Sequence, residues 1–128
     1  MVTLTIGDFT LKAELAVTKE QLITGLSNRD SLPCNEGLLL ILPQEGRIPI
    51  TMKDMRFPID VLFFDSFFKV IDVKDLWEGE IFIPSFSWQF ALETNGIPYI
   101  PTNEFARISD GPSSSSSSSL PVHAPYQP

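Results

Sequence analysis

The sequence predicts a mainly β protein with one or two short helices. Proline and phenylalanine are frequent, with 11 and 10 of 128 residues, whereas alanine is sparse and long stretches with apolar residues at helical spacing are missing. Short apolar runs separated by turn-forming residues take the place of such helices. A chain of this length buries enough apolar surface to fold as a single domain without disulfides.

The first 25 residues predict a β-hairpin followed by a short helix. Residues 2–6 alternate apolar and polar side chains, a Gly-Asp pair supplies a turn, and residues 11–17 continue the period of two. Thr18 and Gln21 match a capping box, in which each side chain accepts a hydrogen bond from a main-chain amide at the start of a helix. Gly25 offers the left-handed conformation that ends one.

Two strands are expected in the next part of the chain. Residues 27–37 are rich in turn formers, so we expect an exposed loop before a continuous apolar strand at 38–42, with the next turn at 43–47. The strand expected at 48–53 contains Pro49, which restricts it to a sheet edge or to pairing after the proline.

The stretch from Ile59 to Phe64 is the clearest buried strand. Its alternation places Leu62 and Phe64 on one face and the other apolar residues on the opposite face. Asp60 shares the face of Leu62 and Phe64, so we expect its carboxyl group among apolar neighbours. Pro58 favours an extended conformation in the residue before it, which predicts a bend ahead of the strand.

Two further strands and one helical segment are expected towards the end of the domain. Residues 67–73 return after a tight connection, and residues 88–92 alternate again, which turns Trp88 inward and Glu93 the other way. Residues 102–107 are expected to form one or two helical turns capped by a threonine.

The composition changes abruptly at Gly111. Residues 111–128 contain seven consecutive serines and four prolines, which bury too little apolar surface to offset the entropy of ordering. We therefore expect one β domain over residues 1–110 and a disordered tail over residues 111–128. His123, the only histidine, lies in that tail and is a poor candidate for catalysis or for a preorganised metal site.

Charge and composition argue against several classes of function. Nine lysines and arginines against sixteen aspartates and glutamates give a net charge of -7, and the resulting field repels nucleic acids. No apolar run approaches the roughly 20 residues of a membrane span, and no secretory signal is visible. Cys34, the single cysteine, is expected to be a half-buried small hydrophobe. These features predict a soluble cytoplasmic protein without nucleic-acid or membrane partners.

Several segments resemble the DUF192 family, a domain of unknown function. The stretch AVTKEQLITGLSNRDSLPCNEGLLLIL resembles its opening pattern: a strand and a short helix ending in Gly-Leu, then Leu-Pro and a Gly-Leu-Leu strand. MKDMRFPIDVLFFD resembles its Met-Lys-Asn and Pro-Leu-Asp segment, and ALETNG its later Leu-Glu-Leu-Asn-Ala-Gly turn. The similarity spans about residues 11–110. It implies a compact, mostly antiparallel β-sandwich or barrel of jelly-roll type, and no established biochemical role.

A charged cluster precedes the buried strand at 59–64. Lys53, Asp54, Arg56 and Asp60 fall within eight positions. We interpret Asp60, together with Pro58, as a structural corner, because a buried carboxylate is costly unless it accepts main-chain amides of the bend or pairs with Lys53 or Arg56. Ligand binding and general acid–base catalysis remain open for the same cluster.

The candidate ligand-binding residues are Arg29, Lys53, Asp54 and Glu93. Arg29 follows the expected helix in a loop that the family resemblance also marks, and its planar guanidinium suits an anionic group beside Lys53. Asp54 and Glu93 belong to a larger set of carboxylates with affinity for hard cations, but neither calcium-type spacing nor a histidine within the domain accompanies them. We therefore expect no metal site and no cofactor.

Aromatic residues are expected mainly in the core. Trp77 and Trp88 are interpreted as core or sheet-covering residues. Phe67 and Phe68 lie at a predicted hairpin tip, where we expect at least one of them to be exposed and to offer a partner surface.

The sequence favours a small non-enzymatic binding or interaction module for a small molecule or a protein partner, and no catalytic residue is assigned. The alternative is an enzyme that acts on a small polar or carbohydrate-like molecule, with Asp54 or Glu93 as the acid or base. Convergence of the four candidate ligand residues in one cleft favours the enzyme, and their scatter over separate surfaces argues against it. The oligomeric state is open.

Overall fold

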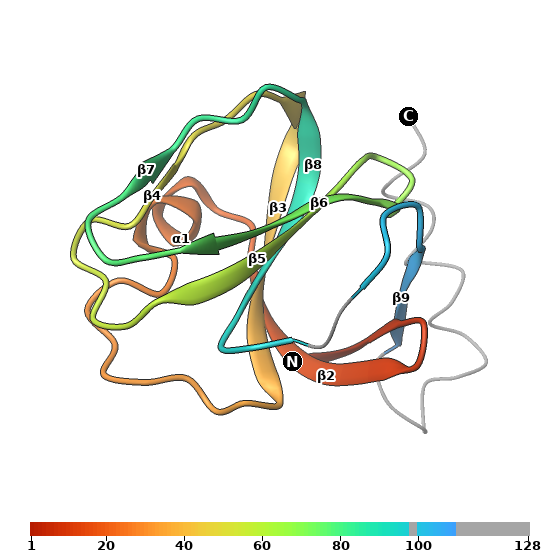
Figure 1. Cartoon of the computed structure of the whole chain (residues 1–128), viewed down its shortest axis with the longest axis horizontal. Helices are drawn as coiled ribbons and strands as arrows, with labels where there is room; N and C mark the ends of the chain where they lie inside the picture. The colour runs from red at the N-terminus through yellow and green to blue at the C-terminus, as the bar shows by residue number, and fades with distance from the viewer. Residues whose placement is uncertain (98–99, 110–128) are drawn as a thin grey trace.

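The fold is seen in a computed structural model, which describes residues 1–97 and 100–109. Within these residues the chain forms nine strands and one helix (Figure 1). In chain order they are β1 (Val2–Ile6), β2 (Phe9–Ala16), α1 (Lys19–Thr24), β3 (Glu36–Gly46), β4 (Ile50–Thr51), β5 (Ile59–Phe64), β6 (Val70–Leu76), β7 (Ile81–Phe82), β8 (Trp88–Thr94) and β9 (Ala106–Ser109). The mainly β prediction is confirmed. The expected tail over residues 111–128, with His123, lies outside the described residues.

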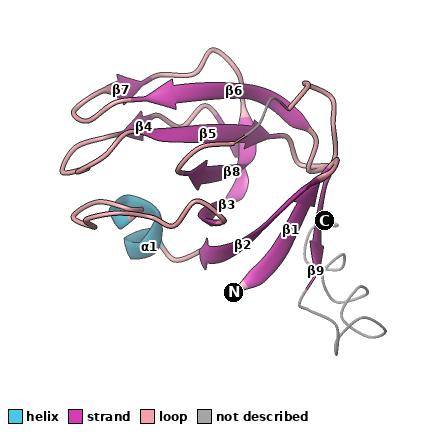
Figure 2. Cartoon of the chain, turned by 60° about the horizontal axis from the view of Figure 1, so that its bottom comes forward, coloured by secondary structure: helices cyan, strands magenta, loops and turns pink. Residues whose placement is uncertain are grey.

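Seven strands form one curled sheet in the order β6-β5-β8-β3-β2-β1-β9. Neighbouring strands are antiparallel except β2 and β3, which run parallel and are joined by a crossover that contains α1. Strands β4 and β7 form a separate two-stranded sheet. Figure 2 shows β6, β5, β8 and β3 stacked side by side while β2, β1 and β9 turn away, so the sheet has the shape of a half-barrel.

The opening hairpin and the short helix form as the sequence predicts. β1 and β2 pair in an antiparallel register. At the start of α1, Gln21 N donates to Thr18 Oγ1 at 3.1 Å and Thr18 N donates to Gln21 Oε1 at 3.0 Å. Gly25 ends the helix with a φ of 51°. None of the six helical residues is buried, but Leu26 immediately afterwards is 1% exposed and anchors this segment to the core.

Both faces of the central strands are buried, as a continuous apolar strand such as β5 requires. Val61 and Phe63 point into a core on the side of α1, which we call the helix-side core, whereas Leu62 and Phe64 point into a core on the side of β9, the β9-side core. The helix-side core also contains Leu26, Leu38, Met52, Trp88 and Ala91, and the β9-side core contains Leu4, Ile6, Leu11, Phe90 and Leu92. The alternation expected for β5 is therefore confirmed.

The two outer strands of the sheet, β6 and β9, approach each other at one end. Three main-chain hydrogen bonds join the start of β6 to the segment that leads into β9. They run from Val70 N to Glu104 O at 2.8 Å, from Asn103 N to Val70 O at 2.9 Å and from Ala106 N to Phe68 O at 2.9 Å. The half-barrel is thus closed at this end.

Past Val70 the half-barrel stays open. Within the described residues, β6 pairs only with β5 beyond this point, and its outer edge has no other main-chain partner. The opening between residues 72–75 of β6 and the side chains of Ile97, Ile100 and Thr102 is called the seam below.

β3 does not end where the sequence suggests. The strand continues from Leu42 through Pro43 to Gly46, where a turn was expected. Its register with β8 is irregular between Ile41 and Gly46, and a proline, which cannot donate to the ladder, is tolerated at such an interruption.

The same irregularity changes the face on which Trp88 lies. Simple alternation puts Trp88 with Phe90 and Leu92, but Trp88 packs in the helix-side core with Ala91. Trp88 is 1% exposed and donates its indole N–H to Ile48 O at 3.0 Å. Its core position is confirmed, whereas the predicted face is wrong.

Three other local predictions are wrong. Residues 102–107 contain no helix, because Ala106 instead pairs with Ile6 at the start of β9. Trp77 follows β6 in a turn and is 60% exposed, not a sheet cover. Cys34 is exposed in the loop before β3.

Candidate functional site

Glu93 is a buried carboxyl group on the helix side of the sheet. It lies on β8 between Leu38 of β3 and Val61 of β5, and only 6% of it is exposed. A Cβ atom at Gly25 would lie 3.5 Å from Glu93 Oε1, so the end of α1 sits directly over the carboxyl group. Within the described residues no side chain or amide donates a hydrogen bond to it. Burial raises the pKa of Glu93 to about 7, and the charge of Arg29 partly opposes this rise.

Arg29 is fixed in place by a second carboxylate. Its Nη1 and Nη2 atoms donate to Glu14 Oε2 at 2.9 Å and to Glu14 Oε1 at 3.1 Å, a two-pronged geometry that aligns the guanidinium plane. These hydrogen bonds lower the pKa of Glu14 and raise the pKa of Arg29. Arg29 therefore interacts with a partly exposed glutamate directly and with the buried Glu93 through its charge.

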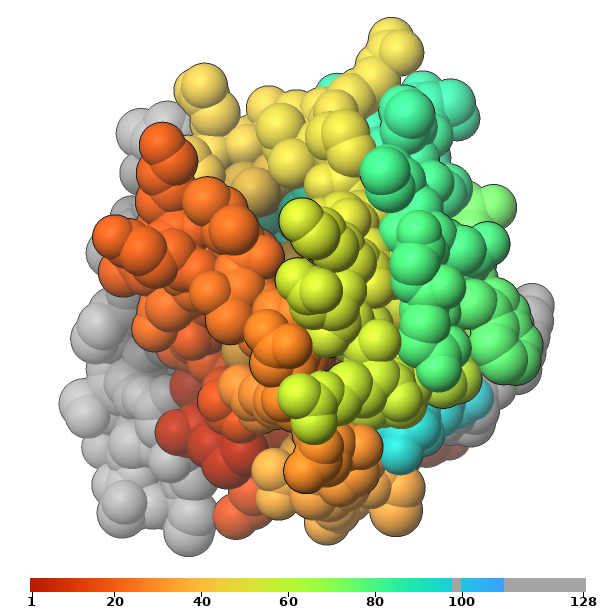
Figure 3. Space-filling model, turned by 90° about the vertical axis from the view of Figure 1, so that its left-hand side faces the viewer, coloured from red at the N-terminus to blue at the C-terminus, as the bar shows by residue number. Residues whose placement is uncertain are grey.

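Lys53 and Asp54 lie in the turn after β4, and both are exposed. Asp54 has a φ of 63°, and its carbonyl oxygen accepts a hydrogen bond from Asn28 N at 2.8 Å. This bond ties the turn to the loop that carries Arg29. Figure 3 shows the face where the α1 segment and the segment around residues 50–57 lie side by side, with a hollow between them.

The four candidate ligand residues are thus brought together only in part. Arg29 and Glu93 interact through charge, and the main chain of Asp54 adjoins the Arg29 loop. The side chains of Lys53 and Asp54 lie in solvent at the border of this region. We refer to these four residues as the Arg29–Glu93 face.

Asp60 is the second unusual carboxyl group, and its partners differ from those expected. Its Oδ2 atom accepts a hydrogen bond from Ile97 N at 3.3 Å, and it lies directly opposite Asp75 in the β5–β6 pair. The amides of the bend before β5 do not bind it. Neither of the alternative cationic partners, Lys53 and Arg56, pairs with it within the described residues, and Arg56 instead binds Asp30 at 2.6 Å on the surface. Asp60 therefore accepts a hydrogen bond from a main-chain amide, as expected of a structural corner. The amide belongs to the turn after β8 and not to the bend before β5.

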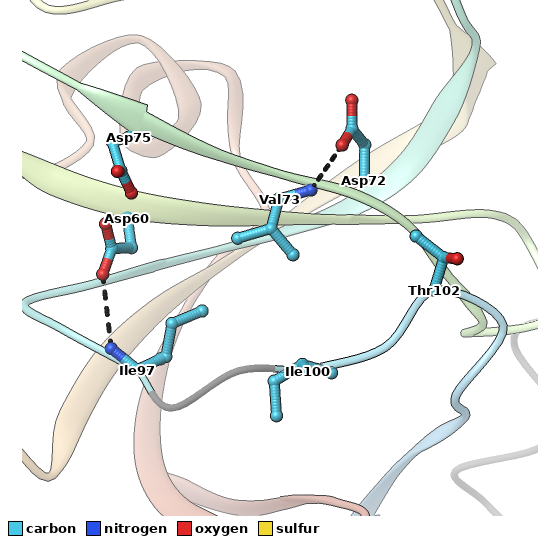
Figure 4. A pocket seen from close by; sticks show the side chains of 7 residues that line it. All are labelled: Asp60, Asp72, Val73, Asp75, Ile97, Ile100 and Thr102. Carbon is cyan, nitrogen blue, oxygen red and sulfur yellow. Dashed lines mark hydrogen bonds between the residues drawn. The ribbon is translucent and has the colours of Figure 1, made fainter.

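Asp60 and Asp75 stand at one end of the seam. A depression of about 350 Å³ is lined by these two residues and by Asp72, Val73, Ile97, Ile100 and Thr102 (Figure 4). In this view the side chains of Asp60 and Asp75 face each other, whereas Asp72 turns away. A second depression of about 220 Å³ adjoins the same pair and reaches Pro58, Trp77 and Asn95.

The proximity of these two aspartates changes the acidity of Asp60. Partial burial, followed by a shared hydrogen bond and like charge with Asp75, raises the pKa of Asp60 to about 6, and the Ile97 amide opposes the rise. No sequence pattern points to Asp75, because its position opposite Asp60 depends on an irregular register between Phe63 and Phe64.

The two phenylalanines of the β5–β6 turn have different environments. Phe67 is 79% exposed. Phe68 has a φ of 67° and packs its ring against Phe64 and Phe90, with centroid distances of 4.9 and 4.8 Å. One exposed aromatic at this tip agrees with the expectation.

Other kinds of site find little support in the part of the chain that the structure describes. No three histidine, cysteine, aspartate or glutamate side chains gather there as a metal ion would require. The single helix is far shorter than a membrane-spanning helix, and no longer apolar helix is found among these residues.

Comparison with known proteins places the chain in a family. The model of the DUF192 family, described as "Uncharacterized ACR", matches residues 2–96. The chain belongs to the DUF192 family. Three segments that carry the family resemblance meet around Glu93. Gly25 of the first lies over its carboxyl group, Val61 of the second pairs with it, and Asn95 of the third donates its Nδ2 to Leu32 O of the first at 2.8 Å.

Two solved structures share the DUF192 fold of this chain. A proposed transcription regulator from Sinorhizobium meliloti 1021 is 21% identical, with a TM-score of 0.74 over 84% of this chain and 91% of that one. A protein of unknown function from Novosphingobium aromaticivorans DSM 12444 is 20% identical, with a TM-score of 0.72 over 83% and 82%. No curated protein matches the sequence. At these identities the likeness concerns the fold alone.

Proposed function

We propose that this DUF192 protein is a small-molecule binding module whose ligand contacts the Arg29–Glu93 face. The observation that carries the proposal is the carboxyl group of Glu93, which is 6% exposed and has no hydrogen-bond donor among the described residues. A carboxyl group with so little contact with water and no protein donor is costly to ionise, but no side-chain oxygen of the described residues is both fully buried and without a partner, so the carboxyl oxygens of Glu93 stay open to a ligand. A ligand that donates a hydrogen bond to Glu93 offsets this cost.

The neighbouring charges narrow the class of ligand. A hydroxyl or ammonium group of the ligand is able to donate a hydrogen bond to Glu93. The guanidinium of Arg29 and the exposed Lys53 favour an anionic group on the same ligand. A small molecule with both features, such as an amino acid or a sugar acid, matches this pairing. The regulator name of the Sinorhizobium protein supports no nucleic-acid function here, because the net charge of -7 disfavours a polyanion.

Ligand-observed NMR with a panel of amino acids, sugar acids and amino sugars tests the proposal. We expect at least one compound to show saturation transfer from the parent protein and to lose it with Glu93→Gln. Glu20→Gln is the matched control, because Glu20 is exposed on α1 and undergoes the same chemical change. Equal binding by parent and Glu93→Gln, or no binding within the panel, contradicts the proposal.

An enzyme acting on a small polar or carbohydrate-like molecule is the second candidate function. A carboxyl group whose pKa is about 7 is suited to general acid–base catalysis near neutral pH. This favours Glu93 over Asp54, whose side chain lies in solvent. Assays with glycoside and ester substrates test the idea: turnover that survives Glu93→Gln excludes Glu93 as the acid or base.

Phe67 is proposed as the contact for a protein partner. Chemical cross-linking and light scattering of Phe67→Ser test whether the exposed ring supports association. Phe68→Ser is the contrast, because Phe68 packs on Phe64 and Phe90 and its loss acts mainly on stability. Association that is unchanged in Phe67→Ser removes this surface from consideration.

A further inference from the structure

At the seam, part of the outer edge of β6 is exposed. The five inner strands of the seven-stranded sheet are paired on both sides. β6 is an outer strand of the seven-stranded sheet, and among residues 1–97 and 100–109 only its start, at Val70, is joined to another segment across its outer edge. Outer strand edges present main-chain donors and acceptors that are able to bind another extended chain. The remaining part, residues 72–75, borders the depression of about 350 Å³.

The side chains at this edge divide into two faces. Val73 and Asp75 lie opposite Leu62 and Asp60, so they share the β9-side face of the sheet. Asp72 lies on the other face, and its carboxylate contacts Lys74 Nζ at 3.6 Å. The seam therefore offers one apolar position at Val73 and, two residues on, a pair of aspartates that forms no salt bridge within the described chain.

The charge of the edge selects the partner. Pairing β6 with β6 of a second copy would place two strands side by side that each carry Asp72 and Asp75 against a single lysine, and like charges on neighbouring strands are destabilising. The net charge of -7 adds to this repulsion. A strand with a basic side chain beside Asp75 and an apolar one beside Val73 is complementary in both respects.

We propose that residues 72–75 of β6 accept an extended basic peptide of another protein as an added strand in the seam. The peptide alternates basic and apolar side chains, so that its lysine or arginine lies beside Asp60 and Asp75 and its apolar residues lie beside Val73, Ile97 and Ile100. This site lies across the sheet from the Arg29–Glu93 face and is independent of it.

One hydrogen bond has to be exchanged when the strand adds. Val73 N donates to Asp72 Oδ1 at 2.8 Å, a bond to a side chain of its own strand. A carbonyl oxygen of the incoming peptide takes this amide, and the released Asp72 carboxylate remains next to Lys74. The edge is thus protected by its own side chain until a partner replaces that bond.

Fluorescence anisotropy with a labelled peptide of about eight residues, alternating lysine and valine, tests the proposal on the full chain. We expect saturable binding to the parent, and binding weaker by about tenfold or more with Asp75→Lys. Asp8→Lys is the matched control, because Asp8 is exposed in the β1–β2 turn and the change in net charge is the same. Circular dichroism verifies that each variant is folded.

Two further peptides separate strand addition from simple charge attraction. A peptide N-methylated at alternate residues keeps its charge but loses the main-chain donors on one edge, and we expect it not to bind. A peptide with glutamate in place of lysine is expected not to bind either. Equal binding of the N-methylated peptide, equal binding by Asp75→Lys, or no binding to the parent overturns the proposal. Glu93→Gln is expected to leave peptide binding unchanged, so this result is distinct from the test of the small-molecule face.

Discussion

Glu93 and Asp60 are carboxyl groups one register position apart on neighbouring strands, yet they face opposite sides of the sheet. Glu93 pairs with Val61, and Asp60 pairs with Thr94. The pKa of each is raised, to about 7 for Glu93 and about 6 for Asp60. For Glu93 the cause is burial with a cation nearby, whereas for Asp60 it is partial burial together with a second aspartate. Similar acidities therefore arise from different surroundings, and the neighbours decide what each group is able to bind.

Both groups make the folded state less stable as the pH rises. A carboxyl group whose folded pKa is above its unfolded pKa binds more protons when folded, so stability falls between the two values. For Glu93 this window runs from 4.5 to about 7, and for Asp60 from 3.8 to about 6. Because the two windows overlap, variants that change one carboxyl group at a time distinguish the two sites.

The largest effect is expected from Glu93→Gln. Glutamine has nearly the same shape but carries no charge, so the cost of burying a carboxylate above pH 7 disappears. We expect the free energy of unfolding to rise by about 3 kcal/mol above this window and to be almost unchanged below it, as measured by urea denaturation. Glu20→Gln serves as the control on an exposed site. A loss of stability above pH 7 would show that Glu93 has a donor in the folded protein.

Arg29→Met is expected to have the next largest effect, in the opposite direction. It removes the two-pronged pair with Glu14, which is worth about 1 kcal/mol for partly exposed side chains, and it leaves Glu93 without a nearby cation. The pKa of Glu93 is expected to rise further, as followed by NMR titration of its side-chain carbonyl carbon. Arg56→Met, which breaks the exposed pair with Asp30, should leave that pKa unchanged. A lower pKa of Glu93 in Arg29→Met contradicts the assigned interaction.

Asp75→Asn is expected to act on the other side of the sheet. It removes the like charge opposite Asp60, so the pKa of Asp60 should fall and the protein should gain up to about 1 kcal/mol above pH 6. NMR titration of Asp60 and urea denaturation measure the two effects. Asp72→Asn is the comparison, because Asp72 pairs with Lys74 on the opposite face. An unchanged pKa of Asp60 would mean that burial alone causes the shift.

The smallest effect is expected from Asp60→Asn. The side-chain amide keeps an oxygen for Ile97 N, a bond of 3.3 Å, while the repulsion with Asp75 is removed. We expect the free energy of unfolding to match the parent below pH 4 and to rise by only about 0.5 kcal/mol above pH 6, because the neutral amide is a weaker acceptor for Ile97 N and this loss offsets most of the gain from removing the charge. A loss of several kcal/mol of unfolding free energy in Asp60→Asn, while Asp75→Asn keeps the stability of the parent, would contradict this expectation. It would show that the structural corner needs the negative charge of Asp60.

The sequence predicts features that depend on residues close together along the chain. The capping box joins Thr18 and Gln21, three positions apart, and the two faces of β5 follow from its own alternation. These relations need no knowledge of strand order, so pattern and propensity are enough to predict them.

The candidate sites depend on pairings between distant segments. Asp60 meets Asp75 only because the β5–β6 register shifts at Phe63, and Arg29 meets Glu14 only because α1 connects two parallel strands. Register and crossover geometry are set by the packing of the whole sheet. For this reason the sequence indicates Arg29 and Glu93 by residue type and position near expected loops, whereas it does not indicate Asp75.

The closure of the half-barrel links the two ends of the domain. Within the part of the chain that the structure describes, β9 pairs in the sheet with β1 alone, and the segment leading into it carries the three bonds to the start of β6. Deleting the first strand would therefore leave β9 without its sheet partner and widen the opening more than 60 residues away in the sequence. A label or tag on this protein should accordingly be placed in an exposed turn and not next to β1 or β9.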